Sequence, residues 1–172
     1  LTQAIETSVK AKAAIVQADE KEETGQRALL NFGHTFGHAL EAAAGYDGRL
    51  LHGEAVAIGM CMAFDLSVRM GLCPASDLER AETHLMNVGL PTRASFIEPA
   101  LSATPEKLIE IMQLDKKAVN GKMRFIVANG IGQTYLSDEA PEDLVLQVLK
   151  DSLGAPPQAK GQWKSAFSLS SG

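Results

Sequence analysis

The fold of this chain is decided around residues 27–41, which read RALLNFGHTFGHALE. Polar residues recur here at spacings of 4, 3, 4 and 3, which places them on one face of an α-helix: Arg27, Asn31, His34, His38 and Glu41. The apolar residues fall off this stripe and can pack into a core: Leu29, Leu30, Phe36 and Leu40. We therefore expect one helix over about 26–44, ended by Gly45, with a continuous polar stripe. Gly33 and Gly37 lie inside it. Each costs roughly 1 kcal/mol relative to Ala, which indicates a close approach by backbone or ligand.

A second informative segment follows at residues 50–60, LLHGEAVAIGM. His52 stands at the start of a helix predicted over about 53–70, which is apolar on nearly all sides and is therefore expected in the middle of the core. The short preceding loop makes the two helices antiparallel neighbours. His34, His38 and His52 can then meet, and three imidazoles are typical ligands of a divalent metal. Glu54 either orients one of these rings or serves as a favourable acid in the first turn of its helix. His84 stands alone and is interpreted as structural.

The rest of the chain predicts a mainly α fold, a helical bundle with one small β-hairpin. Ser76 and Glu79 resemble a capping box, and Asn129-Gly130 marks the hairpin turn. Further helices are expected over about 2–20, 76–88, 105–114 and 141–153, and strands over 123–128 and 133–136. Residues 1–154 are then one domain, and the aperiodic segment 155–172 is a disordered tail.

Composition excludes several classes of function. The net charge of −5 argues against nucleic-acid binding, and no apolar run approaches the roughly 20 residues that span a bilayer. Cys61 and Cys73 are interpreted as buried free thiols, which fits a cytoplasmic location. Leu1 is not an initiator Met, and a helical pattern begins almost at once, which suggests a piece of a longer chain.

The motifs resemble the C-terminal part of 3-dehydroquinate synthase. The resemblance rests on RALLNFGHTFGHALEAAAGYDGRLLHGEAVAIGM at 27–60, KAAIVQADEKEETGQRALLN at 12–31 and DKKAVNGKMRFIV at 115–127, and it fails only in the tail. It implies a zinc or cobalt ion held by two histidines and one glutamate, with His34 and His52 as the histidines. The glutamate would lie upstream of Leu1, and His38 would serve the substrate and proton transfer.

The resemblance also implies a substrate site. Lys12, Arg27 and Asn31 match substrate-binding positions, with Asn31 near the phosphate. One of Lys116 and Lys117 matches a phosphate-binding lysine. Glu23 matches a proton acceptor, although the doubled glutamate leaves Glu22 as a competing assignment.

The implied reaction is that of an NAD- and metal-dependent carbon–oxygen lyase of the shikimate pathway. It converts 3-deoxy-D-arabino-heptulosonate 7-phosphate to 3-dehydroquinate and phosphate. This chain shows no strand, glycine turn and helix of the nucleotide-binding kind, so the N-terminal α/β domain is absent from it. We therefore expect partnership with that domain, a homodimer, and a chain that is inactive and binds metal weakly by itself.

Three alternatives remain. A related sugar-phosphate cyclase or a metal-dependent polyol dehydrogenase would share the metal arrangement, although a small polyol needs no such cluster of anion-binding residues. A non-catalytic helical assembly domain would need no metal and would tolerate loss of His34 or His52.

Overall fold

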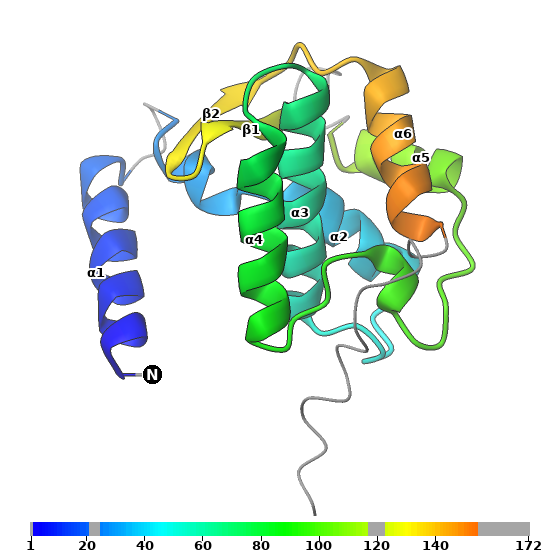
Figure 1. The fold of residues 1–172 in the computed structure, drawn as a ribbon, viewed down its shortest axis with the longest axis horizontal. Helices are drawn as coiled ribbons and strands as arrows, with labels where there is room; N and C mark the ends of the chain where they lie inside the picture. Colours follow the sequence, from blue (N-terminus) through cyan, green and yellow to red (C-terminus); the bar gives the residue numbers. More distant parts are fainter. Residues whose placement is uncertain (1, 21–24, 117–122, 155–172) are drawn as a thin grey trace, which may run out of the picture.

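The computed structural model describes residues 2–20, 25–116 and 123–154. Within these ranges the chain is mainly helical with one two-stranded sheet, as predicted (Figure 1). The elements in chain order are α1 Thr2–Ala18, η1 Arg27–Asn31, α2 His34–Ala43, α3 His52–Arg69, α4 Ala75–Asn87, η2 Ala94–Phe96, α5 Pro105–Lys116, β1 Phe125–Gly130, β2 Gln133–Ser137 and α6 Glu142–Leu153. The predicted tail lies outside the described residues.

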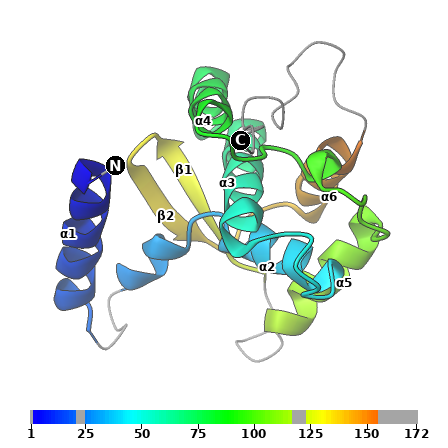
Figure 2. The ribbon, with the colours of Figure 1, turned by 90° about the horizontal axis from the view of Figure 1, so that it is seen from below.

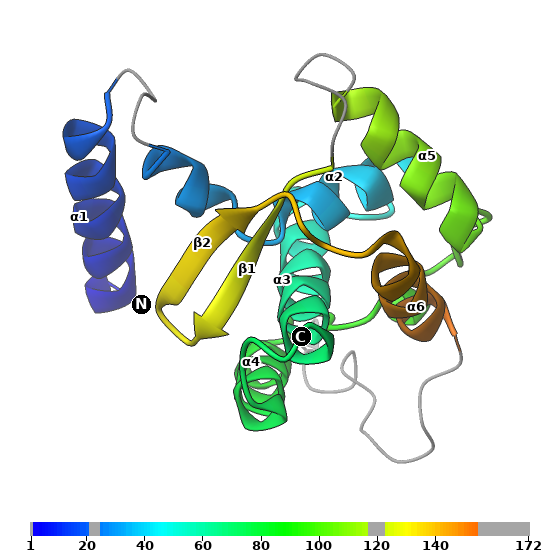
Figure 3. The same ribbon diagram turned by 90° about the horizontal axis from the view of Figure 1, so that it is seen from above.

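Helix α3 forms the centre of the molecule, with α2, α4, α6 and β1 packed around it (Figures 1 and 3). Its side chains Ile58 and Leu66 are fully buried. They join a core built from α2, α5, β1 and α6: Phe36, Leu40, Leu108, Met112, Phe125, Val127, Val145 and Leu149. Each large apolar side chain removed from water contributes about 1.5–3 kcal/mol, so this core holds the helices in place. The prediction from the apolar pattern of α3 is confirmed.

The single helix predicted over 26–44 is wrong. A 3-10 helix, η1, ends at Asn31. Phe32 leaves the helical conformation with ψ 124°, and Gly33 takes a left-handed conformation with φ 82° before α2 begins. The reason is a contact with α3. A Cβ on Gly33 would lie 2.4 Å from the backbone nitrogen of Met60, and a Cβ on Gly59 would lie 2.1 Å from the carbonyl oxygen of Gly33. The expected close approach is therefore one of backbone to backbone.

The hairpin is confirmed, with β1 and β2 paired antiparallel from Phe125 opposite Ser137. Its turn lies at Ile131-Gly132, two residues later than predicted, where Gly132 has φ 83°. The capping box expected at Ser76 and Glu79 is wrong, because α4 begins at Ala75 after Pro74 and has no side-chain cap. Instead, the Oδ2 atom of Asp77 accepts a hydrogen bond from the backbone of Ile131 at 3.3 Å, which ties α4 to the turn.

Helix α1 lies at one edge of the molecule, on the side opposite α5 and α6 (Figure 2). None of its described residues is buried, and Ile5 and Val9 are 55% and 61% exposed. Cys61 and Cys73 are buried free thiols, as predicted. In the part of the chain that the structure describes, no helix is long and apolar enough to cross a membrane.

Candidate metal and substrate site

Three histidines meet where α2 and α3 begin. His34 is the first residue of α2 and His52 the first of α3, and His38 follows His34 by one turn. The ring centroid of His34 lies 5.4 Å from that of His38 and 5.6 Å from that of His52. The ring centroids of His38 and His52 are 6.3 Å apart. The glycine contact between the helices brings these rings together, because a larger residue at Gly33 or Gly59 would hold α2 away from α3.

Two of the three rings are anchored through Nδ1. His34 Nδ1 lies 3.4 Å from the carbonyl oxygen of Phe32, and His52 Nδ1 lies 3.1 Å from Oε1 of Glu41. A carbonyl or carboxylate oxygen only accepts, so each bond places the proton on Nδ1 and leaves the Nε2 lone pair available. His38 makes no hydrogen bond to another described residue. The structure thus separates His34 and His52 from His38.

The surroundings of His34 favour its neutral form. Burial is the largest effect and lowers the pKa of His34 below 6.5. The hydrogen bond to the Phe32 carbonyl opposes it, and the smaller effects of the neighbouring His38 and His52 lower the pKa again. A neutral imidazole is the form that binds a metal. The surroundings of His34 thus favour the protonation state that a metal-binding imidazole requires.

The donor set fits a divalent metal only in part. Two imidazoles that share a zinc ion at Zn–N distances of about 2.0–2.1 Å have ring centroids on the order of 5 Å apart. His34 approaches this separation from both His38 and His52. Among the described residues, however, no group of three or more His, Cys, Asp or Glu side chains is arranged to hold a metal ion. The interpretation that all three histidines are ligands is therefore not supported. A metal ion held by His34 and His52 would need a further ligand beyond the described residues.

The predicted substrate residues are only partly assembled. Arg27 and Asn31 lie on η1, so the polar stripe is broken at Gly33. The backbone nitrogen of Arg27 donates to Oδ2 of Asp19 at 3.1 Å, which ties η1 to the end of α1. Lys12 is exposed on α1, and this helix lies apart from α2 (Figures 1 and 3). Glu22, Glu23, Lys117 and the side chain of Lys116 lie outside the described residues.

Two carboxylates near the histidines have different roles. Oε2 of Glu54 accepts a hydrogen bond from the backbone nitrogen of Leu51 at 2.9 Å, so this acid caps α3, the second of the roles considered for it. Glu41 is instead the carboxylate that contacts an imidazole. Sequence reasoning placed Glu41 in the stripe without a role. Its position one turn after His38 indicated that it lies near the histidines. The spacing could not show that it contacts His52, because His52 is on another helix.

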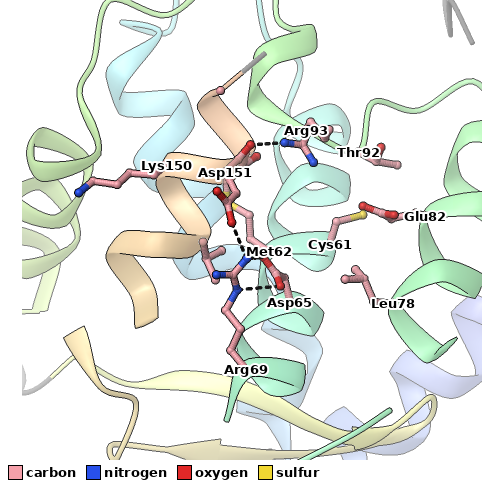
Figure 4. A pocket seen from close by; sticks show the side chains of 13 residues that line it. Cys61, Met62, Asp65, Arg69, Leu78, Glu82, Thr92, Arg93, Lys150 and Asp151 are labelled. Atoms are coloured by element: carbon pink, nitrogen blue, oxygen red, sulfur yellow. Dashed lines mark hydrogen bonds and ion pairs between the residues drawn. The ribbon is translucent and has the colours of Figure 1, made fainter. Parts of the chain in front are cut away.

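A cavity of about 410 Å³ lies between α3, α4 and α6, apart from the histidines (Figure 4). None of the predicted site residues lines it. Arg69 donates to both oxygens of Asp65, at 2.9 and 3.0 Å, and to Oδ2 of Asp151 at 2.6 Å. Because this arginine is occupied by two carboxylates of the same molecule, the network serves to join α3 to α6.

Comparison with known proteins identifies relatives of one kind. Residues 1–118 match the family described as 3-dehydroquinate synthase C-terminal. A 3-dehydroquinate synthase from Ruegeria pomeroyi is 50% identical over 153 residues, which are 89% of this chain and 41% of that protein. One from Brucella anthropi is 52% identical over 153 residues, 88% of this chain and 40% of that protein. The chain spans about two fifths of the length of these relatives.

Two solved structures share the fold. A 2-deoxy-scyllo-inosose synthase complexed with carbaglucose-6-phosphate, NAD+ and Co2+ matches with a TM-score of 0.67 and 25% identity, over 86% of this chain and 40% of that one. The 2-epi-5-epi-valiolone synthase ValA from Streptomyces hygroscopicus subsp. jinggangensis 5008, with NAD+ and Zn2+ bound, matches with a TM-score of 0.71 and 25% identity, over 86% of this chain and 39% of that one.

Proposed function

This chain belongs to the 3-dehydroquinate synthase C-terminal family, and we propose that it supplies the metal- and substrate-binding part of such an enzyme. The reaction converts 3-deoxy-D-arabino-heptulosonate 7-phosphate to 3-dehydroquinate and phosphate. The observation that carries the proposal is the pair of anchored imidazoles, His34 and His52, on the motif that also carries the family resemblance.

His34 and His52 would hold a zinc or cobalt ion through Nε2. Support comes from their Nδ1 hydrogen bonds, their ring separation of 5.6 Å and the lowered pKa of His34. A bound divalent metal supplies Lewis-acid polarisation of a hydroxyl or carbonyl oxygen. The third ligand, a glutamate, would come from a part of the protein outside these 172 residues, together with most of the NAD site.

His38 would serve the substrate. It is exposed and free of hydrogen bonds to described residues, so its ring nitrogens are available to accept or deliver a proton. It also lines a small cavity of about 80 Å³ with Ile111 and Met112 of α5. One of Lys116 and Lys117 would bind the substrate phosphate, as the family resemblance implies.

The remaining assignments concern the substrate's charged groups and the setting of the enzyme. Lys12, Arg27 and Asn31 would bind its carboxylate and phosphate, since cationic side chains and amides suit these anions. Glu23 or Glu22 would accept a proton. The buried free thiols of Cys61 and Cys73 support a reducing, cytoplasmic setting. The enzyme would work as a homodimer, with this chain in contact with its own N-terminal domain.

A sugar-phosphate cyclase acting on another substrate is the second candidate, because the solved structures that share the fold are synthases of that kind. The difference in identity favours the first: 50% and 52% to 3-dehydroquinate synthases against 25% to those cyclases.

The test uses the full-length enzyme with NAD and Co2+. We expect phosphate release from the heptulosonate phosphate and none from glucose 6-phosphate. His34→Ala and His52→Ala should abolish activity without unfolding the protein, whereas His84→Ala on α4 should leave it unchanged, because His84 is exposed and lies outside the histidine cluster. Full activity of both His34→Ala and His52→Ala would instead indicate a non-catalytic assembly domain.

A further inference from the structure

Glu41 contacts His52 across two helices. It lies near the end of α2, and its Oε1 atom is 3.1 Å from Nδ1 of His52 at the start of α3. The two side chains differ in exposure: that of Glu41 is 13% exposed and that of His52 is 61% exposed. A largely buried carboxylate therefore holds an imidazole that is otherwise open to solvent.

This contact determines which nitrogen of His52 is available. An ionised carboxylate accepts only, so the bond places the ring proton on Nδ1 and presents the lone pair of Nε2. It also restricts rotation of the ring, as outer-shell carboxylates do for metal-bound histidines. His34 has only a neutral carbonyl, that of Phe32, in the same position at 3.4 Å. Of these two rings, His52 thus has the shorter and charged anchor.

We propose that Glu41 is a positioning residue that holds His52 in its metal-binding orientation and so sets the metal affinity of the enzyme. The inference rests on the proposed function, because it requires His52 to be a ligand. The alternative is an ordinary exposed ion pair, which contributes about 0–1 kcal/mol to stability and nothing to metal binding. The two readings differ in their effect on metal affinity.

The experiment titrates Co2+ into the metal-free full-length enzyme in competition with a chromophoric chelator. Glu41→Ala should weaken Co2+ binding about 10–100-fold, the usual effect of losing an outer-shell partner. Glu41→Gln should weaken it less, because the amide oxygen still accepts from Nδ1 but carries no charge. The visible absorption of bound Co2+ should change in Glu41→Ala, since the orientation of one ligand is no longer held.

Glu54→Gln is the matched control. Glu54 is a carboxylate of the same neighbourhood, but it contacts the backbone of Leu51 and no imidazole, so its loss should leave Co2+ affinity unchanged. In a His52→Ala background, Glu41→Ala should have no further effect, because Glu41 acts through His52.

The outcomes separate the two levels of the proposal. If His52→Ala weakens Co2+ binding and Glu41→Ala does not, the positioning role is overturned and the metal site stands. If Glu54→Gln weakens binding as much as Glu41→Ala, the effect is a general disturbance of the helix ends and the positioning role is again overturned. If His52→Ala has no effect, the proposed metal site itself fails.

Discussion

At the scale of single residues, Gly33 and Gly59 allow the backbones of α2 and α3 to come into contact beside the site. The carbonyl oxygen of Gly33 and the backbone around Gly59 and Met60 are in direct contact, with no room for a Cβ on either glycine. The left-handed φ of 82° at Gly33 also turns the chain from η1 into α2. These two residues therefore determine how close His34 lies to His52.

Substitution of Gly33 by alanine should destabilise the chain by at least about 2 kcal/mol, because it combines backbone overlap with a strained φ. Urea unfolding followed by circular dichroism measures the loss. Gly53→Ala is the control, since a Cβ there meets nothing within 4 Å and alanine is favoured over glycine in a helix by up to about 1 kcal/mol. Equal stability of Gly33→Ala and the parent chain would refute the contact.

The lowered pKa of His34 predicts a pH dependence of the metal-free chain. In the window between its lowered pKa and 6.5 the unfolded state binds more protons than the folded state, so the free energy of unfolding rises with pH. The contribution of His34 to the free energy of unfolding is fully present above pH 6.5 and is lost as the pH falls through the lowered pKa of this residue. Urea unfolding at pH 7.5 and 5.5 should show a larger loss for the parent chain than for His34→Gln. Parallel losses would contradict the shift.

At the scale of elements, the hairpin is attached to α3 through a buried serine. Ser67 is fully buried; its hydroxyl donates to the carbonyl of Ala63 at 2.6 Å and accepts from the backbone nitrogen of Ala128 at 2.9 Å. In the same way, the hydroxyl of Ser152 on α6 accepts a hydrogen bond from the backbone nitrogen of Ala94. In both places a serine hydroxyl of one helix accepts a hydrogen bond from a backbone N–H of another element.

Ser67→Ala should cost about 1–3 kcal/mol, the usual penalty for leaving a buried backbone N–H without an acceptor. Chemical denaturation gives the difference, and amide hydrogen exchange at Ala128 should become faster. The comparison variant is Ser76→Ala on the exposed surface of α4, which should stay within about 0.5 kcal/mol of the parent. Unchanged exchange at Ala128 would show that α3 does not anchor β1 through this bond.

At the scale of the whole molecule, the described residues bring together two candidate ligands and no complete metal site. The chain also spans about two fifths of its relatives' length. Helix α1, with the exposed side chains of Ile5 and Val9, stands at the edge of the core rather than in it. These observations support the proposal that residues outside these 172 would complete the metal site.

The 172-residue chain by itself should release no phosphate from the heptulosonate phosphate with NAD and Co2+. Its Co2+ binding should be weaker than that of the full-length enzyme by about 100-fold or more, since loss of an outer-shell partner alone already costs about 10–100-fold. Competition titration of both proteins measures this ratio. Appreciable turnover by the 172-residue chain would contradict the proposal that the third metal ligand and most of the NAD site lie outside it.

The sequence by itself determined the helical class, the hairpin and the central place of α3. It also determined which three histidines meet: His34, His38 and His52. These follow from local periodicity, turn residues and motif, which depend on neighbours in the chain. Only the tertiary structure decided that the helix breaks at Gly33 and that Glu41 anchors His52. The physical reason is that each of the decisive contacts, Gly33 with Gly59 and Glu41 with His52, joins two separate helices. The spacing of residues along one helix carries no information about what a second helix places against it.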